Sequence, residues 1–287
     1  MSISIAYLGP PGTYAEAATL AYVRTLTTEA GRKSLLCPYP SIAQTLQSVA
    51  QEQAHLAVVP VENSIEGSVT TTLDMLWQLD TLQIQQALVL PIRHALLSRA
   101  SSIEAIQTVY SHPQALAQCQ GWLEKFLPLA QLVPASSTTE ALQYLDKDHS
   151  LGVITSQRAA QLYNLPILAS AINDYPDNYT RFWVMGKQLS VGGTHTSLAF
   201  SAPANLPGAL AKPLQVFASR GINLSRIESR PTKRSLGEYL FFIDFEADAS
   251  QEPVQAALSE LAPHTEILKI FGSYSVLQID SLNLLDT

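Results

Sequence analysis

The chain has 287 residues, of which 47% are hydrophobic and 14% are charged, and its formal net charge is −7. This length predicts about two domains, and so apolar a composition excludes an intrinsically disordered protein. Neither the first two thirds nor the remainder is basic, and no apolar run approaches the roughly 18 residues of a membrane span, so neither nucleic acid nor a membrane is an expected partner.

The N-terminus and the cysteines favour the cytoplasm. The segment after Met1 lacks a basic region and runs straight into a strand pattern, which is not typical of a signal peptide. Cys37 and Cys119 lie far apart in the sequence and have no metal-like neighbours. We therefore expect neither a disulfide scaffold nor a zinc site, and we expect a cytoplasmic location.

Short apolar runs alternate with helix-period stretches along the first two thirds of the chain. Ile42, Leu46 and Val49 repeat at i, i+4 and i+7, as residues on one face of an amphipathic helix do. The apolar runs predict strands at residues 3–8, 56–61, 108–111, 130–133 and 151–154. Strands that alternate with helices predict an α/β fold with parallel strands.

Several predicted helices begin at a capping-box pattern, in which Ser or Thr is followed three residues later by Glu or Gln. The starts are Thr13, Ser41, Ser111 and Ser137. Helix N-termini at the carboxyl ends of strands offer unpaired N–H groups and the positive end of the helix dipole. This edge favours an anionic small molecule, although capped helices are common to all α/β proteins.

A different pattern follows residues 188–196, which predict a linker because Gly192-Gly193 interrupts any regular element. The expected elements beyond it are a strand at 197–201, a helix at 207–219, strands at 223–230 and 238–246, a helix at 253–261 and a strand at 265–270. This order of elements predicts a ferredoxin-like (βαββαβ) domain.

Two polar clusters are candidates for a functional site. Glu62, Asn63 and Ser64 lie in the turn after an apolar strand, where polar groups suit ligand contact but are equally typical of an ordinary turn. Thr180 and Arg181 combine a hydroxyl with a side chain that can bind a carboxylate through two hydrogen bonds. The alternative for this second cluster is an edge strand with an incidental ion pair.

His112 lies in a predicted turn at a strand end and is a candidate general acid or base. A single histidine is more often a structural hydrogen-bonding group, so both interpretations stay open. The histidine spacings are not typical of a metal site, and the chain contains neither GxGxxG nor GxxxxGK. No metal or organic cofactor is expected.

Seven short motifs follow one another along the chain. They are Gly9-Pro-Pro-Gly-Thr-Tyr14, Val59-Pro-Val-Glu-Asn-Ser64, Ser111-His-Pro-Gln-Ala-Leu116, Ser137-Thr138, Asn178-Tyr-Thr-Arg-Phe182, Gly208-Ala-Leu-Ala211 and Glu228-Ser-Arg-Pro231. In this order they resemble the prephenate dehydratase family, and the last two resemble the phenylalanine-binding motifs of its appended ACT regulatory domain. The departures from the family pattern are mild, and they are Tyr14, Ala15, Val61, Ala211 and Gly237.

The resemblance implies an α/β fold with two parts. A two-lobed catalytic domain similar to the class II periplasmic binding proteins would span residues 1–187, and a ferredoxin-like ACT domain would span 197–280. The first lobe would comprise about residues 1–78 together with a returning segment at 172–187, and the second lobe about 79–171. The substrate cleft would lie between the lobes.

The resemblance also implies an activity. Prephenate would lose CO2 and water to give phenylpyruvate in L-phenylalanine biosynthesis, under regulation by L-phenylalanine. Thr180 would hydrogen-bond the departing hydroxyl, and Glu62 is the alternative proton source. The residues expected to line the substrate site are Thr13, Asn63, Ser64, Ser111, Gln114, Ser137, Thr138, Arg181 and Phe182, although Phe182 could equally be a core residue. The residues expected at the effector site are Gly208, Ala209, Leu210, Ala211, Glu228, Ser229, Arg230 and Pro231.

Two alternatives stay open. Arogenate dehydratase differs only in accepting an amino group where prephenate has a keto oxygen, and a non-catalytic amino-acid-binding sensor could share the two-lobed shape. The motif around Thr180 favours an enzyme, a carbon–oxygen lyase, over a sensor. We expect a homodimer or homotetramer formed through the ACT and catalytic domains.

Overall fold

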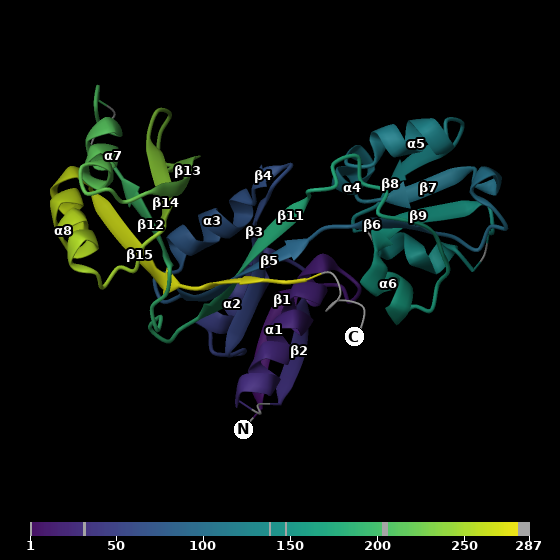
Figure 1. Ribbon diagram of the computed structural model, residues 1–287, viewed down its shortest axis with the longest axis horizontal. Helices are drawn as coiled ribbons and strands as arrows, with labels where there is room; N and C mark the ends of the chain where they lie inside the picture. Colours follow the sequence, from purple (N-terminus) through teal and green to yellow (C-terminus); the bar gives the residue numbers. More distant parts are fainter. Residues whose placement is uncertain (1, 31–32, 138, 147, 203–205, 281–287) are drawn as a thin grey trace.

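Three β-sheets organise the part of the chain that the structure describes (Figure 1). The structure is a computed structural model, and it describes residues 2–30, 33–137, 139–146, 148–202 and 206–280. We call the parts built on these sheets the first lobe, the second lobe and the C-terminal domain. None of the helices in these ranges is long and apolar enough to cross a membrane.

The first lobe contains a seven-stranded sheet with the order β16-β5-β11-β3-β1-β2 and a short β4 beside β3. Its elements are β1 (Ile3–Leu8), α1 (Tyr14–Ala30), β2 (Ser34–Tyr39), α2 (Ile42–Ala50), β3 (Leu56–Asn63), β4 (Gly67–Ser68), α3 (Thr70–Gln78), β5 (Gln83–Pro91), β11 (Tyr179–Gly186) and β16 (Val276–Gln278). Ile5 and Tyr7 of β1 enter the core that contains the alanines of α1, whereas Ala6 enters the core that contains Leu46 of α2. Both faces of this sheet are therefore covered, as buried parallel strands require.

The boundary between the lobes differs from the expected one at residue 79. β5 pairs with β11 along its length and so belongs to the first sheet. Ile84 and Leu88 of β5 enter the two cores of the first lobe. An apolar run predicts a strand in a sheet that is covered on both faces, but it does not indicate which sheet the strand joins. The sequence alone therefore did not assign β5 to the first lobe.

The second lobe begins at β6 and contains a five-stranded sheet with the order β10-β6-β9-β7-β8. Its elements are β6 (His94–Leu97), η1 (Ile103–Ala105), β7 (Thr108–Ser111), α4 (Pro113–Ala117), α5 (Gln120–Phe126), β8 (Gln131–Pro134), η2 (Glu140–Tyr144), β9 (Leu151–Ser156), α6 (Gln157–Leu162) and β10 (Ile167–Ser170). The chain crosses between the lobes twice, from β5 to β6 and from β10 to β11. The prediction of a two-lobed α/β fold is confirmed.

The C-terminal domain contains an antiparallel sheet with the order β13-β14-β12-β15. Its elements are β12 (His195–Ser201), α7 (Ala211–Ala218), β13 (Leu224–Pro231), β14 (Tyr239–Phe245), α8 (Glu252–Leu261), η3 (Ala262–His264) and β15 (Ile267–Tyr274). This strand order confirms the predicted ferredoxin-like fold. Helix α7 begins later than predicted, because residues 207–210 form a turn.

The C-terminal sheet packs on its own helices with one face and on the first lobe with the other. Phe241 and Ile243 of β14 point toward the core under α7 and α8, whereas Leu240 and Phe242 share a core with Trp183 of β11. After β15 the chain enters β16, which pairs with β5 at the edge of the first sheet and appears as the yellow strand at the centre of Figure 1. The C-terminal domain and the first lobe therefore share one core and are joined through one sheet edge.

Candidate active site

The two lobes face each other at the edge where strands of the first sheet end and helices begin. A cavity of about 1000 Å³ lies there, lined by residues 9–11 and 38–40 of the first lobe and by Ser136, Ser137 and Thr139 of the second, among others. Residues 9–11 follow β1 and residue 40 follows β2. Ligands of open α/β sheets bind at such carboxyl ends of strands, so this cavity is a candidate substrate cleft.

Contacts at the start of α1 join the lobes beside this cavity. Thr13 Oγ1 accepts from Glu16 N at 3.3 Å, as the capping-box pattern predicts. Ser156 Oγ of the second lobe donates to the Gly12 carbonyl at 2.6 Å, and Arg158 Nε lies 3.3 Å from Glu16 Oε2. Thr13 is therefore held at the interface between the lobes.

Asn63 and Thr180 lie opposite each other on β3 and β11. Asn63 Oδ1 accepts from the backbone N–H groups of Ile65 and Glu66, both at 3.1 Å. Backbone N–H groups only donate, so the amide is fixed with Nδ2 toward Thr180, and Nδ2 donates to Thr180 Oγ1 at 2.9 Å. The hydrogen of the Thr180 hydroxyl then points away from Asn63 and can donate to a bound group.

Two further amides extend this pair to the second lobe. Asn63 Nδ2 also donates to Asn178 Oδ1 at 2.8 Å, and Asn178 Nδ2 donates to Gln118 Oε1 at 2.8 Å. Gln118 follows α4, and all four side chains are buried. Asn178 opens the motif around Thr180, and Gln118 belongs with the motif that begins at Ser111, but neither residue is among those that the sequence assigns to the site.

Arg181 and Glu62 lie on the opposite face of the same two strands. Successive side chains of a strand point to opposite faces, so Arg181 and Glu62 turn away from the face that carries Thr180 and Asn63. Arg181 Nη1 lies 3.4 Å from Asp244 Oδ2 of the C-terminal domain, and Nη2 lies 3.6 Å from Glu62 Oε2. In this structure Arg181 therefore contacts the C-terminal domain and Glu62, and the predicted roles of Arg181 in substrate binding and of Glu62 as a proton source gain no support from their placement.

Phe182 and Ser111 were also expected to line the cleft, but both are buried structural residues. Phe182 is 2% exposed and packs with Ile5 and Leu88 in a core of the first lobe. Ser111 is fully buried, and its Oγ donates to the Ile154 carbonyl on the neighbouring strand at 2.6 Å. A motif gives the order of residues but not the side to which each one points.

The start of α4 differs from the predicted capping box. His112 Nδ1 accepts from Gln114 N at 3.3 Å, so His112 caps this helix in place of Ser111. Gln114 is exposed in the first turn. His112 thus takes the structural role that the sequence left open.

The remaining predicted substrate residues are three hydroxyl-bearing side chains. Ser64 Oγ accepts from Tyr179 N at 2.9 Å and so holds the start of β11. Ser137 lines the cavity between the lobes. Thr138 lies outside the described residues.

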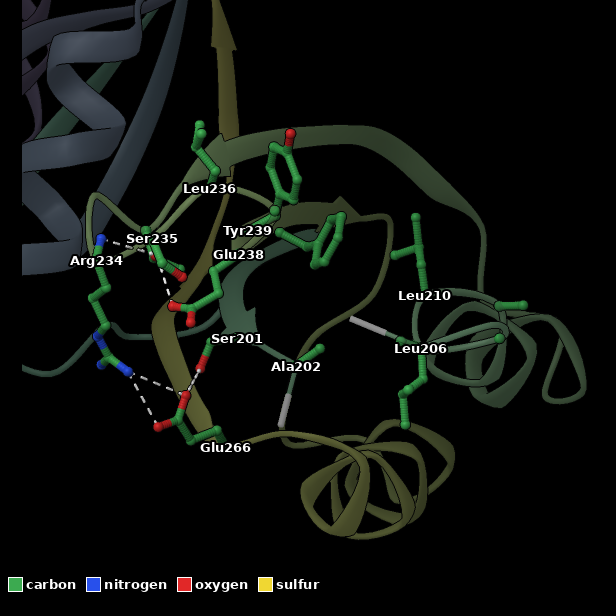
Figure 2. Close-up of a pocket in the computed structure, with 16 residues that line it drawn as sticks. Ser201, Ala202, Leu206, Leu210, Arg234, Ser235, Leu236, Glu238, Tyr239 and Glu266 are labelled. Atoms are coloured by element: carbon green, nitrogen blue, oxygen red, sulfur yellow. Dashed lines mark hydrogen bonds and ion pairs between the residues drawn. The ribbon is translucent and has the colours of Figure 1, made fainter. Parts of the chain in front are cut away.

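A second cavity, of about 650 Å³, lies in the C-terminal domain (Figure 2). The predicted effector residues 208–211 line it. Figure 2 shows Leu206 and Leu210 on one side and the charged side chains on the other, where Arg234 Nη1 lies 3.2 Å from Glu266 Oε1. Apolar and charged walls together suit an amino acid.

The second predicted effector motif, residues 228–231, does not line this cavity. Glu228 Oε2 accepts from Ser68 Oγ at 3.0 Å, and Arg230 donates to both carboxylate oxygens of Asp74 at 3.0 and 3.2 Å. The other two members of the motif, Ser229 and Pro231, are exposed. Within this chain, Glu228 and Arg230 therefore attach the C-terminal domain to the first lobe.

The part of the chain that the structure describes contains no cluster of three metal-ligating His, Cys, Asp or Glu side chains. Cys37 and Cys119 are free thiols. Burial raises the pKa of Cys119 to about 12, so this thiol stays protonated and unreactive at neutral pH.

Comparisons with known proteins agree with this arrangement. A sequence model of the prephenate dehydratase family matches residues 5–190, and one of the ACT domain matches residues 196–263. The bifunctional chorismate mutase/prephenate dehydratase of Aquifex aeolicus is 42% identical over 274 residues, which are 95% of this chain and 73% of the relative. The prephenate dehydratase of Methanocaldococcus jannaschii is 38% identical over 280 residues, covering 96% of this chain and 99% of the relative.

A solved structure leads to the same family. The crystal structure of prephenate dehydratase from Arthrobacter aurescens in complex with L-Phe has a TM-score of 0.84 and 35% sequence identity, and the match covers 95% of this chain and 90% of that one. The chain belongs to the prephenate dehydratase family.

Proposed function

We propose that this chain converts prephenate to phenylpyruvate, CO2 and water in the biosynthesis of L-phenylalanine. The observation that carries the proposal is the Thr180 hydroxyl, which Asn63 orients at the junction of the lobes. The family match and a relative named prephenate dehydratase, aligned over 96% of this chain, support the reaction.

The reaction needs a hydrogen-bond donor at the oxygen of the departing ring hydroxyl. When the ring carboxylate leaves as CO2, the electron pair of its C–C bond enters the ring, the C–O bond to the ring hydroxyl breaks, and the ring becomes aromatic. Hydroxide is a poor leaving group, so a hydrogen bond to this oxygen stabilises the transition state. A threonine hydroxyl is too weak an acid to be ionised at neutral pH, so Thr180 donates a hydrogen bond and the leaving hydroxide takes its proton from solvent.

Helix N-termini replace Arg181 as the groups proposed to hold the substrate carboxylates. α1 and α2 begin just after residues that line the first-lobe side of the cleft, and helix N-termini favour anions. Ser137 and Thr138 stay in the proposed site as hydroxyl donors, and Thr13 stays beside it as the cap of α1, with its hydroxyl donating to the Leu8 carbonyl at 3.2 Å. The cavity of about 1000 Å³ is large enough for prephenate. Its lining includes Ser137 but neither Thr180 nor Asn63, so the proposal places the ring hydroxyl of the substrate beyond this lining, toward Thr180.

Steady-state kinetics of the purified chain with prephenate and with arogenate test the proposal. We expect turnover of prephenate that is lost in Thr180→Ala while the circular dichroism spectrum stays unchanged. Preferential turnover of arogenate would instead make the chain an arogenate dehydratase. Calorimetric binding of an amino acid without turnover of either substrate would make it a sensor.

We also propose that L-phenylalanine binds the C-terminal cavity and regulates the enzyme. We propose further that the enzyme is a homodimer or homotetramer. The L-Phe complex of the Arthrobacter relative supports the ligand. Leu206 and Leu236 beside the cavity are largely exposed, and a second copy could cover them. Calorimetry with L-phenylalanine tests the ligand, and sedimentation velocity with and without it tests the assembly. The absence of a heat of binding would contradict the proposed ligand. A monomer both with and without L-phenylalanine would contradict the proposed assembly. The cytoplasmic location remains a prediction.

A further inference from the structure

His94 is a buried histidine at the point where the chain first crosses between the lobes. It opens β6 and is only 3% exposed. Its backbone N–H donates to Asn173 Oδ1 at 2.7 Å, and its carbonyl accepts from Ile172 N at 3.0 Å. The returning segment between β10 and β11 therefore holds its backbone in place.

The two ring nitrogens of His94 contact one group from each lobe. Nδ1 lies 2.9 Å from the hydroxyl oxygen of Tyr14 in α1, and Nε2 lies 3.1 Å from Gln118 Oε1. The Tyr14 and His94 rings also meet edge to face, with centroids 5.5 Å apart. Burial holds the pKa of His94 below its usual value, although the hydrogen bond with Gln118 opposes the shift. The neutral ring carries a single N–H.

The hydrogen-bond directions determine which ring nitrogen carries that hydrogen. Backbone N–H groups fix Asn63 with Nδ2 toward Asn178. Asn178 therefore presents Oδ1 to Asn63 and Nδ2 to Gln118, so Gln118 presents Oε1 to both Asn178 and His94. An amide oxygen only accepts. His94 Nε2 is then the donor, and Nδ1 accepts from the Tyr14 hydroxyl.

We propose that His94 is a positioning residue, which acts on Thr180 through the three buried amides. The proposal rests on the dehydratase activity proposed above. The Nε2–H group of His94 keeps the Gln118 oxygen toward Asn178. If Gln118 rotated, its NH2 group would meet the NH2 group of Asn178. Asn178 would then turn, and Asn63 would lose an acceptor that holds it beside Thr180.

Three substitutions at position 94 separate this role from packing. His94→Leu removes both ring nitrogens, and the single hydrogen of the Tyr14 hydroxyl, released from Nδ1, can then go to the Arg93 carbonyl 3.0 Å away. His94→Gln can place an NH2 group near the position of Nε2 and donate to Gln118, whereas His94→Asn is one methylene too short. We expect kcat for prephenate to fall about tenfold in the Leu and Asn variants, with KM within about twofold, and to recover in the Gln variant.

Nitrogen NMR of histidine-labelled protein gives a readout independent of activity. The His94 signals, assigned from their loss in His94→Gln, should show a protonated Nε2 and a bare Nδ1 at about pH 8. Tyr14→Phe should weaken this preference between the tautomers. Equal kcat in the Asn and Gln variants, or a hydrogen on Nδ1 of the wild type, overturns the proposal. A wild type without prephenate turnover overturns the proposed function instead, while the NMR result still decides the hydrogen-bond assignment.

Discussion

Thr180 owes its proposed role to the amide beside it rather than to a charged neighbour. Asn63 occupies one lone pair of the hydroxyl, so the direction of the hydrogen is set before a substrate binds. A donor oriented in advance needs no reorganisation in the transition state. The motifs predict that Asn63 and Thr180 belong to one site, and the two side chains are in contact. They did not predict the contact of Asn63 with Gln118, which lies 55 residues away on the other lobe.

Thr180→Val should abolish most turnover, because it keeps the shape of the side chain and removes the donor. Loss of one oriented donor lowers kcat about 100-fold or more. Thr180→Ser keeps the hydroxyl and is the matched control, which should retain most of the activity. Steady-state kinetics with prephenate compare the two, and a Val variant with nearly wild-type kcat would show that the hydroxyl does not act on the leaving group.

His94 should make the protein less stable in mildly acidic solution. Burial holds its pKa in the folded chain below the usual 6.5, so the unfolded chain takes up a proton at a pH where the folded chain does not. The contribution to stability is complete above pH 6.5 and is lost as the pH falls from there toward the folded-state pKa. Urea titrations at about pH 7.5 and about pH 5.5 should show a smaller loss for His94→Gln than for the wild type. Equal losses would contradict this.

β11 is the element that joins the two proposed functions, because its two faces serve different parts of the molecule. Thr180 faces the junction of the lobes, and Arg181 faces Asp244 of the C-terminal domain. The adjacent residues of the sequence motif predict a single site, whereas the two-residue period of a strand sends neighbouring side chains to opposite faces.

A predicted element is accurate where nearby residues determine it and inaccurate where pairing with a distant strand determines it. β1 and β7 have the predicted bounds, since a short apolar run between turns specifies a buried strand by itself. The membership of β5 in the first sheet follows from its pairing with β11, about 100 residues later, and no local pattern expresses that pairing. For the same reason no local pattern predicts β16, which returns to β5 from beyond the C-terminal domain.

Arg181→Met should destabilise the protein and leave KM for prephenate unchanged. Asp244 is buried and keeps its contacts with Arg226 Nε at 2.8 Å and Ser197 Oγ at 2.6 Å, so the loss is partial. We expect the free energy of unfolding to fall by about 1 kcal/mol. Urea unfolding and steady-state kinetics measure the two quantities. A tenfold rise in KM without a loss of stability would return Arg181 to the substrate site.

At the scale of the whole molecule, the C-terminal domain is built into the first lobe rather than tethered beside it. Phe242 and Tyr274 share a core with Trp183 of β11, and Arg230 binds Asp74 of α3. A change in the geometry of the C-terminal domain therefore has to alter contacts on the back of the strand that carries Thr180. An effector can shift such a balance only by its difference in affinity for the two arrangements.

Arg230→Met should weaken the effect of L-phenylalanine on the rate without removing its binding. Arg230 attaches the C-terminal domain to α3 and does not line the effector cavity. Arg234 follows β13 in the same hairpin, lines the cavity and pairs with Glu266. Arg234→Met is therefore the matched control, and it should weaken binding instead.

Calorimetry and titration of activity with L-phenylalanine separate the two variants. For Arg230→Met we expect a Kd within about threefold of the wild-type value and a change in rate at saturation that is at most about half as large. Arg234→Met should show a weaker Kd and a full response at saturation, because its attachment to the first lobe is intact. If Arg230→Met responds to L-phenylalanine as the wild type does, the ion pair between Arg230 and Asp74 does not transmit the effect of the ligand to the first lobe. The signal then reaches β11 through the apolar core that Phe242 shares with Trp183, where Phe242→Leu is the next variant to measure.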